Sequence, residues 1–459
     1  MKQDAGASSV FDSLIYRDMF GTEAMRAVFS DRQRVVFWLE AEVALAAAEG
    51  ALGVIPAEAA TAIAAAGRPD VIDLDALRAG MWTVGRPIVS LLNQVGATGG
   101  PLVQDWLHWG ATTQDIMDTG CVLQLRAALK VLRPETVSLL RQLAALAELH
   151  RETVMVGRTN GQDAGPISFG LLLASYAAEL LRGLRRIDAA ARDAMVVQFG
   201  GAVGTLAAVG PDGLRVRAEL ARRLGLQEPQ AAWNASRDTL AALVQALALV
   251  HAVLGRAAGD INRLSSTGEV AEGAPGSSST LPGKRNPRGS EFVGGIARMA
   301  RIRAAGALEM TDQADVRQGA PWISEWSTLP EMFLLTSATL VRSAELFAGL
   351  RVNQATMRRR FDQGRGEVMA EAAMMLLAPQ TGRARAYAIV RQALCRAPGA
   401  SLAEALAADP DARSLMAGLD LSVALDPSAW LGAGPELVSA TSQAVLKALD
   451  EEGRLTAAS

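Results

Sequence analysis

The sequence predicts an all-α protein, with a long central helical bundle flanked by smaller helical N- and C-terminal domains. Three long segments, residues 119–151, 166–195 and 236–264, carry apolar residues at the i, i+3 and i+4 spacing of a helix. No segment has the alternating pattern of a long strand, and no stretch of the sequence repeats. With 459 residues, 50% of them hydrophobic, the chain can bury the cores of two or three domains.

The first elements follow from local signals taken in chain order. Residues 35–50 have helical spacing and end at a glycine, which is a common helix stop. The segment 119–151 is expected to form one long helix in which Pro134 causes a kink or a break. The segment 166–195 has Pro166 in its expected first turn, where a proline is tolerated because that amide has no helical partner.

The later elements set the domain boundaries. The segment 236–264 is apolar on nearly every side between Leu240 and Leu254, which predicts a helix covered all round in the core of an oligomer. Beyond residue 351 the pattern shortens into small helices separated by helix-breaking residues: Pro379, Gly382, Pro398, Pro410 and Pro427. We therefore expect three domains, at residues 1–108, 109–350 and 351–459.

Bulk properties exclude several classes of function. A net charge of −3 with both signs interspersed gives no field for nucleic acid. The two cysteines, Cys121 and Cys395, suggest no disulfide framework, and residues 1–9 lack the apolar stretch of a signal peptide, which favours the cytoplasm. The most apolar run, residues 240–255, is too short for a membrane span. The three histidines are not at metal-ligand spacing, so we expect no metal and no other cofactor.

The most informative segment is a loop between two helical patterns, with the sequence Ser-Ser-Ser-Thr-Leu-Pro-Gly-Lys-Arg-Asn-Pro at residues 277–287. Its backbone amides, the Lys284 ammonium and the Asn286 amide could all donate to one anion. A serine held beside these groups could lose its proton and act as a base. A flexible linker is the alternative that composition alone allows. A phosphate-binding loop is excluded, because Ser278 stands where that motif needs glycine and Arg285 where it needs serine or threonine.

This loop resembles the signature loop of the fumarase/aspartase superfamily. Two further segments, residues 108–119 and 157–166, resemble the other two signature regions of that superfamily. Segments near both ends, at residues 29–56 and 367–432, are similar to its 3-carboxy-cis,cis-muconate cycloisomerase branch. The loop, the two other signature regions and the N-terminal segment are four motifs in the family's order, and with the C-terminal segment the match spans nearly the whole chain, which leaves little room for chance agreement. The resemblance implies an all-α homotetramer whose active sites combine segments from different subunits.

The resemblance also implies a reaction. Members of the superfamily remove a proton next to a carboxylate and expel a leaving group from the neighbouring carbon, usually giving fumarate. Carried over by motif, Ser278 would be the base, while Lys284 and Asn286 would hold the aci-carboxylate as its second charge develops. The alternative roles are a surface lysine and a helix N-cap, respectively.

Other positions would bind a small di- or tricarboxylate substrate. Four come from the first region, of which Thr112, Thr113 and Gln114 could instead cap the following helix, and four come from the second region. Arg237 and Arg317 match family positions as carboxylate clamps, whereas Arg17 and Arg86 are undecided. The full set of expected substrate-binding residues is His108, Thr112, Thr113, Gln114, Arg158, Thr159, Asn160, Gln162, Arg237 and Arg317, of which His108 could instead be structural.

The departures from the family pattern concern proton donors. Asn160 stands where many members have histidine, and Asn234, Asp315 and Ile323 stand where the cycloisomerase branch tends to have histidines. A positioned general acid typically contributes about 10²–10⁴-fold. These losses favour a lyase whose leaving group is a stabilised anion, and the elimination of nitrite from nitrosuccinate to give fumarate is the concrete hypothesis.

Three alternatives remain at this point. A 3-carboxy-cis,cis-muconate cycloisomerase is favoured by overall resemblance, while the missing histidines count against it. Adenylosuccinate lyase fits less well, since fewer polar groups stand where a nucleotide phosphate would bind. A non-catalytic structural bundle is opposed by the intact Ser278, Lys284 and Asn286.

Overall fold

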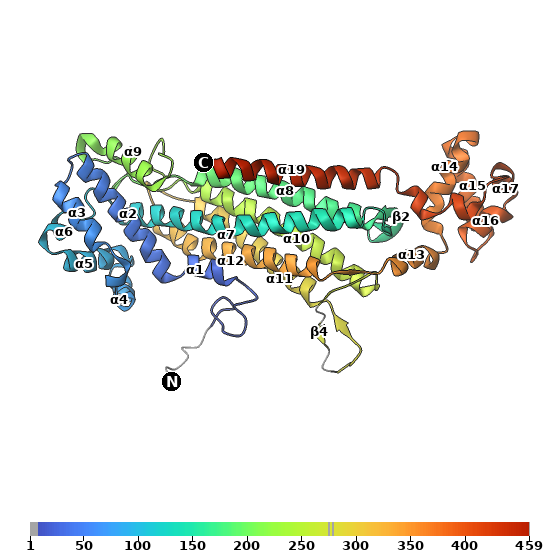
Figure 1. Ribbon diagram of the computed structural model, residues 1–459, viewed down its shortest axis with the longest axis horizontal. Helices are drawn as coiled ribbons and strands as arrows, with labels where there is room; N and C mark the ends of the chain where they lie inside the picture. The colour runs from blue at the N-terminus through green and yellow to red at the C-terminus, as the bar shows by residue number, and fades with distance from the viewer. Residues whose placement is uncertain (1–7, 274–275, 278–279, 459) are drawn as a thin grey trace. The chain divides into compact units, whose positions relative to one another are not determined.

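A computed structural model describes residues 8–273, 276–277 and 280–458 (Figure 1). About 70% of the chain is helical and the few strands are short, which confirms the all-α prediction. The chain divides into two compact units. The first unit comprises Met1–Thr136, Gly183–Ala252 and Gly295–Val341, and the second comprises Val137–Arg182, Val253–Gly294 and Arg342–Ser459.

Five long helices contribute residues to both units. They are α7 (Thr113–Leu149), α8 (Phe169–Ala194), α10 (Asp238–Ser266), α11 (Arg288–Gly306) and α12 (Gly319–Ala348). Helix α7 continues through Pro134, so the proline removes one amide donor from the helix without ending it. Helix α10 is the one described helix long and apolar enough to cross a bilayer, and 67% of its most apolar window is buried within the protein.

The first unit adds short helices that pack around α2. Their bounds are α1 (Glu23–Val28), α2 (Asp31–Ala51), α3 (Ala57–Ala66), η1 (Pro69–Val71), α4 (Leu74–Val84), α5 (Ile88–Gly99), α6 (Pro101–Trp106), η2 (Gly210–Asp212), α9 (Gly213–Leu224) and η3 (Ala307–Thr311). Helix α2 begins four residues before its predicted start because the Ser30 hydroxyl accepts a hydrogen bond from the Gln33 amide and caps it. Its buried face, which includes Trp38 and Leu45, forms the centre of this unit's core.

The second unit contains every described strand and the C-terminal helices. Its strands are β1 (Val154–Thr159), β2 (Gln162–Ser168), β3 (Val270–Ala271), β4 (Gly276–Ser277), β5 (Arg285–Asn286) and β6 (Arg351–Val352), paired antiparallel as β1–β2, β3–β6 and β4–β5. Its further helices are α13 (Gln354–Gln363), η4 (Glu367–Met369), α14 (Ala370–Thr381), α15 (Arg383–Arg396), α16 (Leu402–Ala408), α17 (Pro410–Leu415), α18 (Leu421–Ala424), η5 (Pro427–Trp430) and α19 (Gly434–Ala458). A second hydrophobic core contains buried residues of the four helices α14, α15, α16 and α17, together with Val156 of β1.

Two sequence expectations are wrong in this unit. Pro166 does not begin a helix. It lies in β2, where it pairs with Val156 of β1, and α8 begins only at Phe169. The expectation of only small helices after residue 351 is also wrong, because α19 has 25 residues. The predicted boundaries at 108/109 and 350/351 cut the chain into three continuous segments. Each of the two units instead combines three separate stretches of the chain, and the long helices contribute to both units. Those boundaries therefore stay a prediction.

Candidate functional site

The predicted site residues fall in both units, and Ser278 lies outside the described residues. In the first unit, the segment from His108 to Thr113 leads into α7. Gly110 has a φ of 65°, and a Cβ atom there would lie 2.4 Å from a methyl carbon of Val209. Only glycine therefore allows the backbone to follow this path. This backbone path determines the positions of the Thr112 and Thr113 hydroxyl groups that follow it.

Asp115 fixes this segment from inside the unit. Its carboxylate accepts hydrogen bonds from the amides of Thr112 (3.0 Å), Gly200 (3.0 Å) and Gly201 (2.9 Å), and from the side chain of Gln198 (3.2 Å). Burial raises the pKa of Asp115 to about 6, although these four donors oppose the shift. Because the Asp115 carboxylate accepts a hydrogen bond from the Thr112 amide, it holds the first turn of α7 in place.

The Thr112 hydroxyl is then free to face a cation. It accepts a hydrogen bond from Arg317 Nη1 at 3.0 Å, across 205 residues of sequence. The Thr112 hydroxyl therefore contacts an arginine. Its two expected roles, in binding substrate and in capping the N-terminus of α7, stay predictions. Gln114 points inward instead, since its amide nitrogen donates to Asp118 (3.0 Å) and to the Asn234 carbonyl (2.9 Å). Thr113 is half-buried at the start of α7.

A second arginine, Arg86, lies close to Arg317. Its guanidinium stacks over the rings of Trp322 (4.8 Å) and Trp326 (5.2 Å). Partial burial, together with the charge of Arg317, lowers the pKa of Arg86. In the described part of the chain, neither arginine forms an ion pair with a carboxylate. Two cations without a counterion, beside a threonine hydroxyl, fit the carboxylates of an anionic ligand.

The other two candidate arginines of this unit are already paired. Arg17 lies 3.8 Å from Asp18 at the surface. Arg237 is 1% exposed and forms bidentate hydrogen bonds with both Asp118 and Glu325, at 2.7–3.0 Å for three of the four contacts. Arg237 has the bidentate hydrogen-bonding geometry expected of it, but its partners are two carboxylates of the same chain. A role for Arg237 in binding substrate stays a prediction.

His108 is held by a carboxylate that the sequence did not single out. Its Nδ1 lies 2.6 Å from Glu42 Oε1, and the two side chains are 15% and 2% exposed. Burial opposes a charge on this imidazole, but the attraction and hydrogen bond of Glu42, helped by Asp115, raise its pKa above the ordinary value. The available signal was the presence of Glu42 and Glu49 on the buried face of α2, where charged residues are rare.

We expect Glu42→Gln to lower the pKa of His108 and to destabilise the protein by about 1.5–3 kcal/mol near pH 6. Because the folded-state pKa of His108 is raised, the stabilisation is fully present below the unfolded value of 6.5 and is lost as pH rises through the folded value. Histidine NMR titrations and urea unfolding at pH 6 and pH 9 measure both effects. The matched control is Glu40→Gln on the exposed side of α2. An equal loss of stability at the two pH values would contradict the pairing.

In the second unit, the second region forms the tip of the β1–β2 hairpin. Asn160 and Gly161 are its two turn residues, with φ angles of 52° and 78°, and Thr159 pairs with Gln162 across the ladder. Two positive φ angles define the turn in which Asn-Gly is the favoured pair. Arg158 is occupied within the unit, since it lies 2.7 Å from Glu269 and 3.3 Å from Asp163. The side chains of Thr159, Asn160 and Gln162 are exposed.

The signature loop is closed at its base by the β4–β5 ladder, in which Gly276 pairs with Asn286 (Figure 1). Lys284 is exposed, and no carboxylate of the described residues lies within ion-pair distance of its ammonium. Asn286 does not cap α11. The amides of Gly289 (2.7 Å) and Ser290 (3.1 Å) instead donate to the carboxylate of Glu272. The alternative role of Asn286 as an N-cap is therefore wrong.

All three histidines of the chain lie in the described residues, and each has a partner. His108 binds Glu42, and His150 lies 3.1 Å from Thr153. His251 is fully buried between Thr336 (3.0 Å) and Thr339 (3.2 Å), and burial lowers its pKa to about 3. Neither His150 nor His251 stands in a signature region. His108 is thus the one histidine that lies beside the predicted site residues of the first unit.

Comparisons with known proteins agree along the whole chain. Residues 19–301 match a family model described as lyase, and residues 366–441 match the adenylosuccinate lyase C-terminus. The chain is 38% identical to a 3-carboxy-cis,cis-muconate cycloisomerase of Bradyrhizobium diazoefficiens, over 92% of this chain and 95% of that protein. It is 34% identical to an N-acetyl-S-(2-succino)cysteine lyase of Enterococcus italicus, over 83% and 85%.

Solved structures give the same result. A 3-carboxy-cis,cis-muconate lactonizing enzyme from Pseudomonas putida matches with a TM-score of 0.88 and 35% identity, over 94% of this chain and 98% of that chain. A fumarate lyase from a Mesorhizobium species matches with a TM-score of 0.87 and 38% identity, over 92% and 98%.

Proposed function

We propose that this chain, which belongs to the fumarase/aspartase superfamily of lyases, is an enzyme that interconverts 3-carboxy-cis,cis-muconate and its lactone. The observation that supports this most is the pair Arg86 and Arg317 beside the Thr112 hydroxyl, with no carboxylate of the described residues to neutralise it. A substrate with three carboxylates supplies the missing negative charge. Relatives that share about 38% of the sequence carry the cycloisomerase name.

The proposed reaction needs one base and one set of donors. In lactone formation, one carboxylate of the substrate attacks a carbon–carbon double bond conjugated to another carboxylate, and a C–O bond forms. The π electrons move onto the second carboxylate, which becomes the aci-carboxylate, and the Ser278 hydroxyl gives its proton to the carbon beside it. Lys284 and Asn286 donate to the aci-carboxylate while it carries its second charge. Lactone opening runs through the same steps in reverse.

The missing histidines do not count against this reaction. In lactone opening the leaving group is a carboxylate, whose conjugate acid has a pKa of about 4, so it departs as an anion without a proton. Asn160 has a separate structural explanation, because it occupies a turn that favours Asn-Gly. An asparagine at this position therefore gives no information about the leaving group.

A second candidate is the lyase that eliminates nitrite from nitrosuccinate to give fumarate. The observation that bears on it is Asn234, which stands where the cycloisomerase branch tends to have histidine and is compatible with either leaving group. Asn234 is 2% exposed, and neither polar atom of its side chain has a hydrogen-bond partner in the described residues. An amide cannot transfer a proton to a leaving group, whereas nitrite, like a carboxylate, leaves as a stable anion.

Both candidates can be tested with one set of assays. Purified protein is given 3-carboxy-cis,cis-muconate or nitrosuccinate. The consumption of carboxymuconate, the formation of fumarate and the release of nitrite are each measured. The proposal expects turnover of carboxymuconate that is lost in Ser278→Ala and a raised KM in Arg317→Gln. The matched control is Arg215→Gln, whose side chain is 67% exposed and whose one ion pair within the described part of the chain is with Asp212. Release of nitrite alone would replace the first candidate with the second, and turnover of neither substrate would refute both.

We further propose that the enzyme is a homotetramer. Apolar side chains on its long helices support this, since Leu249 of α10, Ile302 of α11 and Leu437 of α19 are 47%, 73% and 55% exposed in the single chain. Light scattering measures the assembly directly. A monomer at micromolar concentration would contradict the proposal.

A further inference from the structure

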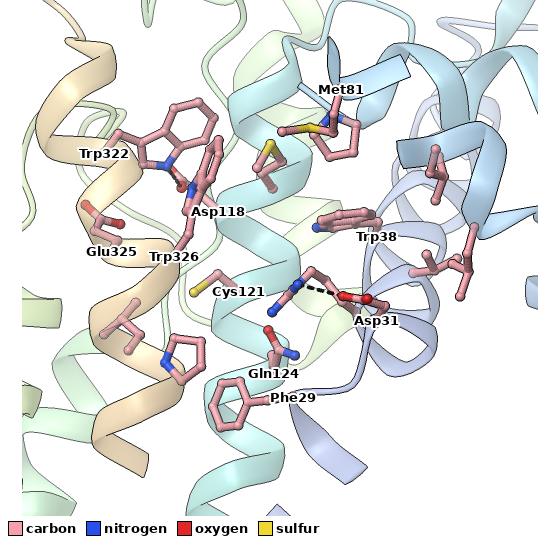
Figure 2. A pocket seen from close by; sticks show the side chains of 18 of the residues that line it. Phe29, Asp31, Trp38, Met81, Asp118, Cys121, Gln124, Trp322, Glu325 and Trp326 are labelled. Atoms are coloured by element: carbon pink, nitrogen blue, oxygen red, sulfur yellow. Dashed lines mark hydrogen bonds and ion pairs between the residues drawn. The ribbon is translucent and has the colours of Figure 1, made fainter. Parts of the chain in front are cut away.

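A cavity of about 300 Å³ lies in the first unit among α2, α4, α7 and α12 (Figure 2). Its wall is mainly apolar and is dominated by three indole rings, those of Trp38, Trp322 and Trp326. Met81 and several aliphatic side chains complete the apolar part of the wall. A cavity of this size, with aromatic walls and a few polar groups, has the features of a small-molecule site. None of the residues predicted to bind the carboxylate substrate lines it.

The polar groups of the wall balance except at one place. Arg34 pairs with Asp31 at 3.1 Å, as the dashed line in Figure 2 shows, and Arg78 pairs with Asp75 at 3.2 Å. On the facing wall, Asp118 and Glu325 share the single guanidinium of Arg237. This buried cluster of two carboxylates and one arginine, all 1–3% exposed, holds one more carboxylate than it has guanidinium groups.

The spare hydrogen-bonding capacity is at Glu325. Asp118 accepts four hydrogen bonds, two from Arg237 and one each from Trp322 (3.0 Å) and Gln114 (3.0 Å), so its lone pairs are used. Among the described residues, Glu325 accepts hydrogen bonds only from Arg237, one on each oxygen, which leaves one acceptor position on each oxygen. Burial raises the pKa of Glu325 above its ordinary value, although Arg237 opposes the shift, as expected for a buried anion with half a partner.

We propose that this cavity binds a small organic cation with an aromatic or alicyclic body, whose ammonium or amidinium group donates to Glu325. The cation supplies the charge that Arg237 cannot supply to both carboxylates, and the Trp38 indole attracts it through its face, whereas Arg86 already stacks over Trp322 and Trp326. The apolar body displaces water from the rest of the wall. An anionic ligand is disfavoured by the net charge, so the polyanionic substrate of the proposed reaction belongs elsewhere. The inference goes beyond that function and does not depend on it.

The test uses three ligands of one shape and different charge: phenethylamine, 2-phenylethanol and phenylacetate. Isothermal titration of the full-length protein should show that phenethylamine binds about tenfold or more tightly than 2-phenylethanol, since its hydrogen bond is charge-assisted. Phenylacetate should give no detectable binding. Glu325→Gln should reduce the preference for the amine over the alcohol to about twofold or less. Thermal unfolding of the variant checks that it folds.

A second pair of variants keeps the test decisive if Glu325→Gln does not fold. Cys121 lines the cavity on α7, whereas Cys395 is exposed on α15. Cys121→Leu narrows the cavity without touching a charge, so it should weaken phenethylamine binding at least tenfold, and Cys395→Leu should leave it unchanged. Equal binding of the amine and the alcohol would overturn the proposal. So would an amine preference that survives in Glu325→Gln, or an affinity that Cys121→Leu does not change.

Discussion

Replacing Arg237 with methionine should destabilise the protein by about 3–5 kcal/mol. The substitution preserves much of the side-chain volume but leaves Asp118 and Glu325, which are 2% and 3% exposed, without a positive partner. A buried carboxylate without a counterion must either stay charged in a medium of low polarity or take up a proton, and both cost free energy. Urea unfolding at pH 7, followed by circular dichroism, measures the loss.

Two controls separate charge from packing. Arg215→Met makes the same substitution at a side chain that is 67% exposed, and it should change stability by less than about 0.5 kcal/mol. Adding Glu325→Leu to Arg237→Met removes one of the two orphaned charges and should recover part of the loss. If Arg237→Met were as stable as the parent, or if Glu325→Leu made it worse, the buried charge would not be the cause.

Replacing Lys284 with methionine should lower kcat by about 10²–10³-fold with little change in stability. The Lys284 side chain is exposed and has no ion-pair partner among the described residues, so the folded chain does not depend on it. In the proposed reaction its ammonium stabilises the second charge of the aci-carboxylate, which exists only after the substrate has bound. The loss should therefore appear in kcat more than in KM.

Steady-state kinetics provides the measurement, on whichever substrate the assays under Proposed function show to be turned over. Lys447→Met is the matched control, because that lysine is also exposed and forms a surface ion pair with Glu451 at 3.8 Å. It should retain full activity. A kcat for Lys284→Met within threefold of the parent would show that Lys284 does not stabilise the transition state.

Part of the fold was readable from sequence because its signals are local. The spacing of apolar residues predicted α2 and α10 to within about four residues at their ends, and burial of one face is what holds both helices. The β1–β2 hairpin is absent from the prediction, although Asn160-Gly161 is the strongest short hairpin signal, because Pro166 also fits the first turn of a helix. Proline is tolerated there since its missing amide does not prevent antiparallel pairing with Val156 in this two-stranded ladder.

The sequence by itself determined the superfamily, the all-α class and the chemical types at the signature positions, because each is written in short, contiguous motifs. It could not determine what those side chains face. Arg237 and Arg317 have the same charge and both match family positions, yet Arg237 is neutralised by Asp118 and Glu325, which lie 119 and 88 residues away along the chain. Arg317 instead meets the Thr112 hydroxyl and the charge of Arg86. Only the tertiary structure distinguishes the two arginines, because the charge that surrounds a side chain is supplied by residues distant in sequence.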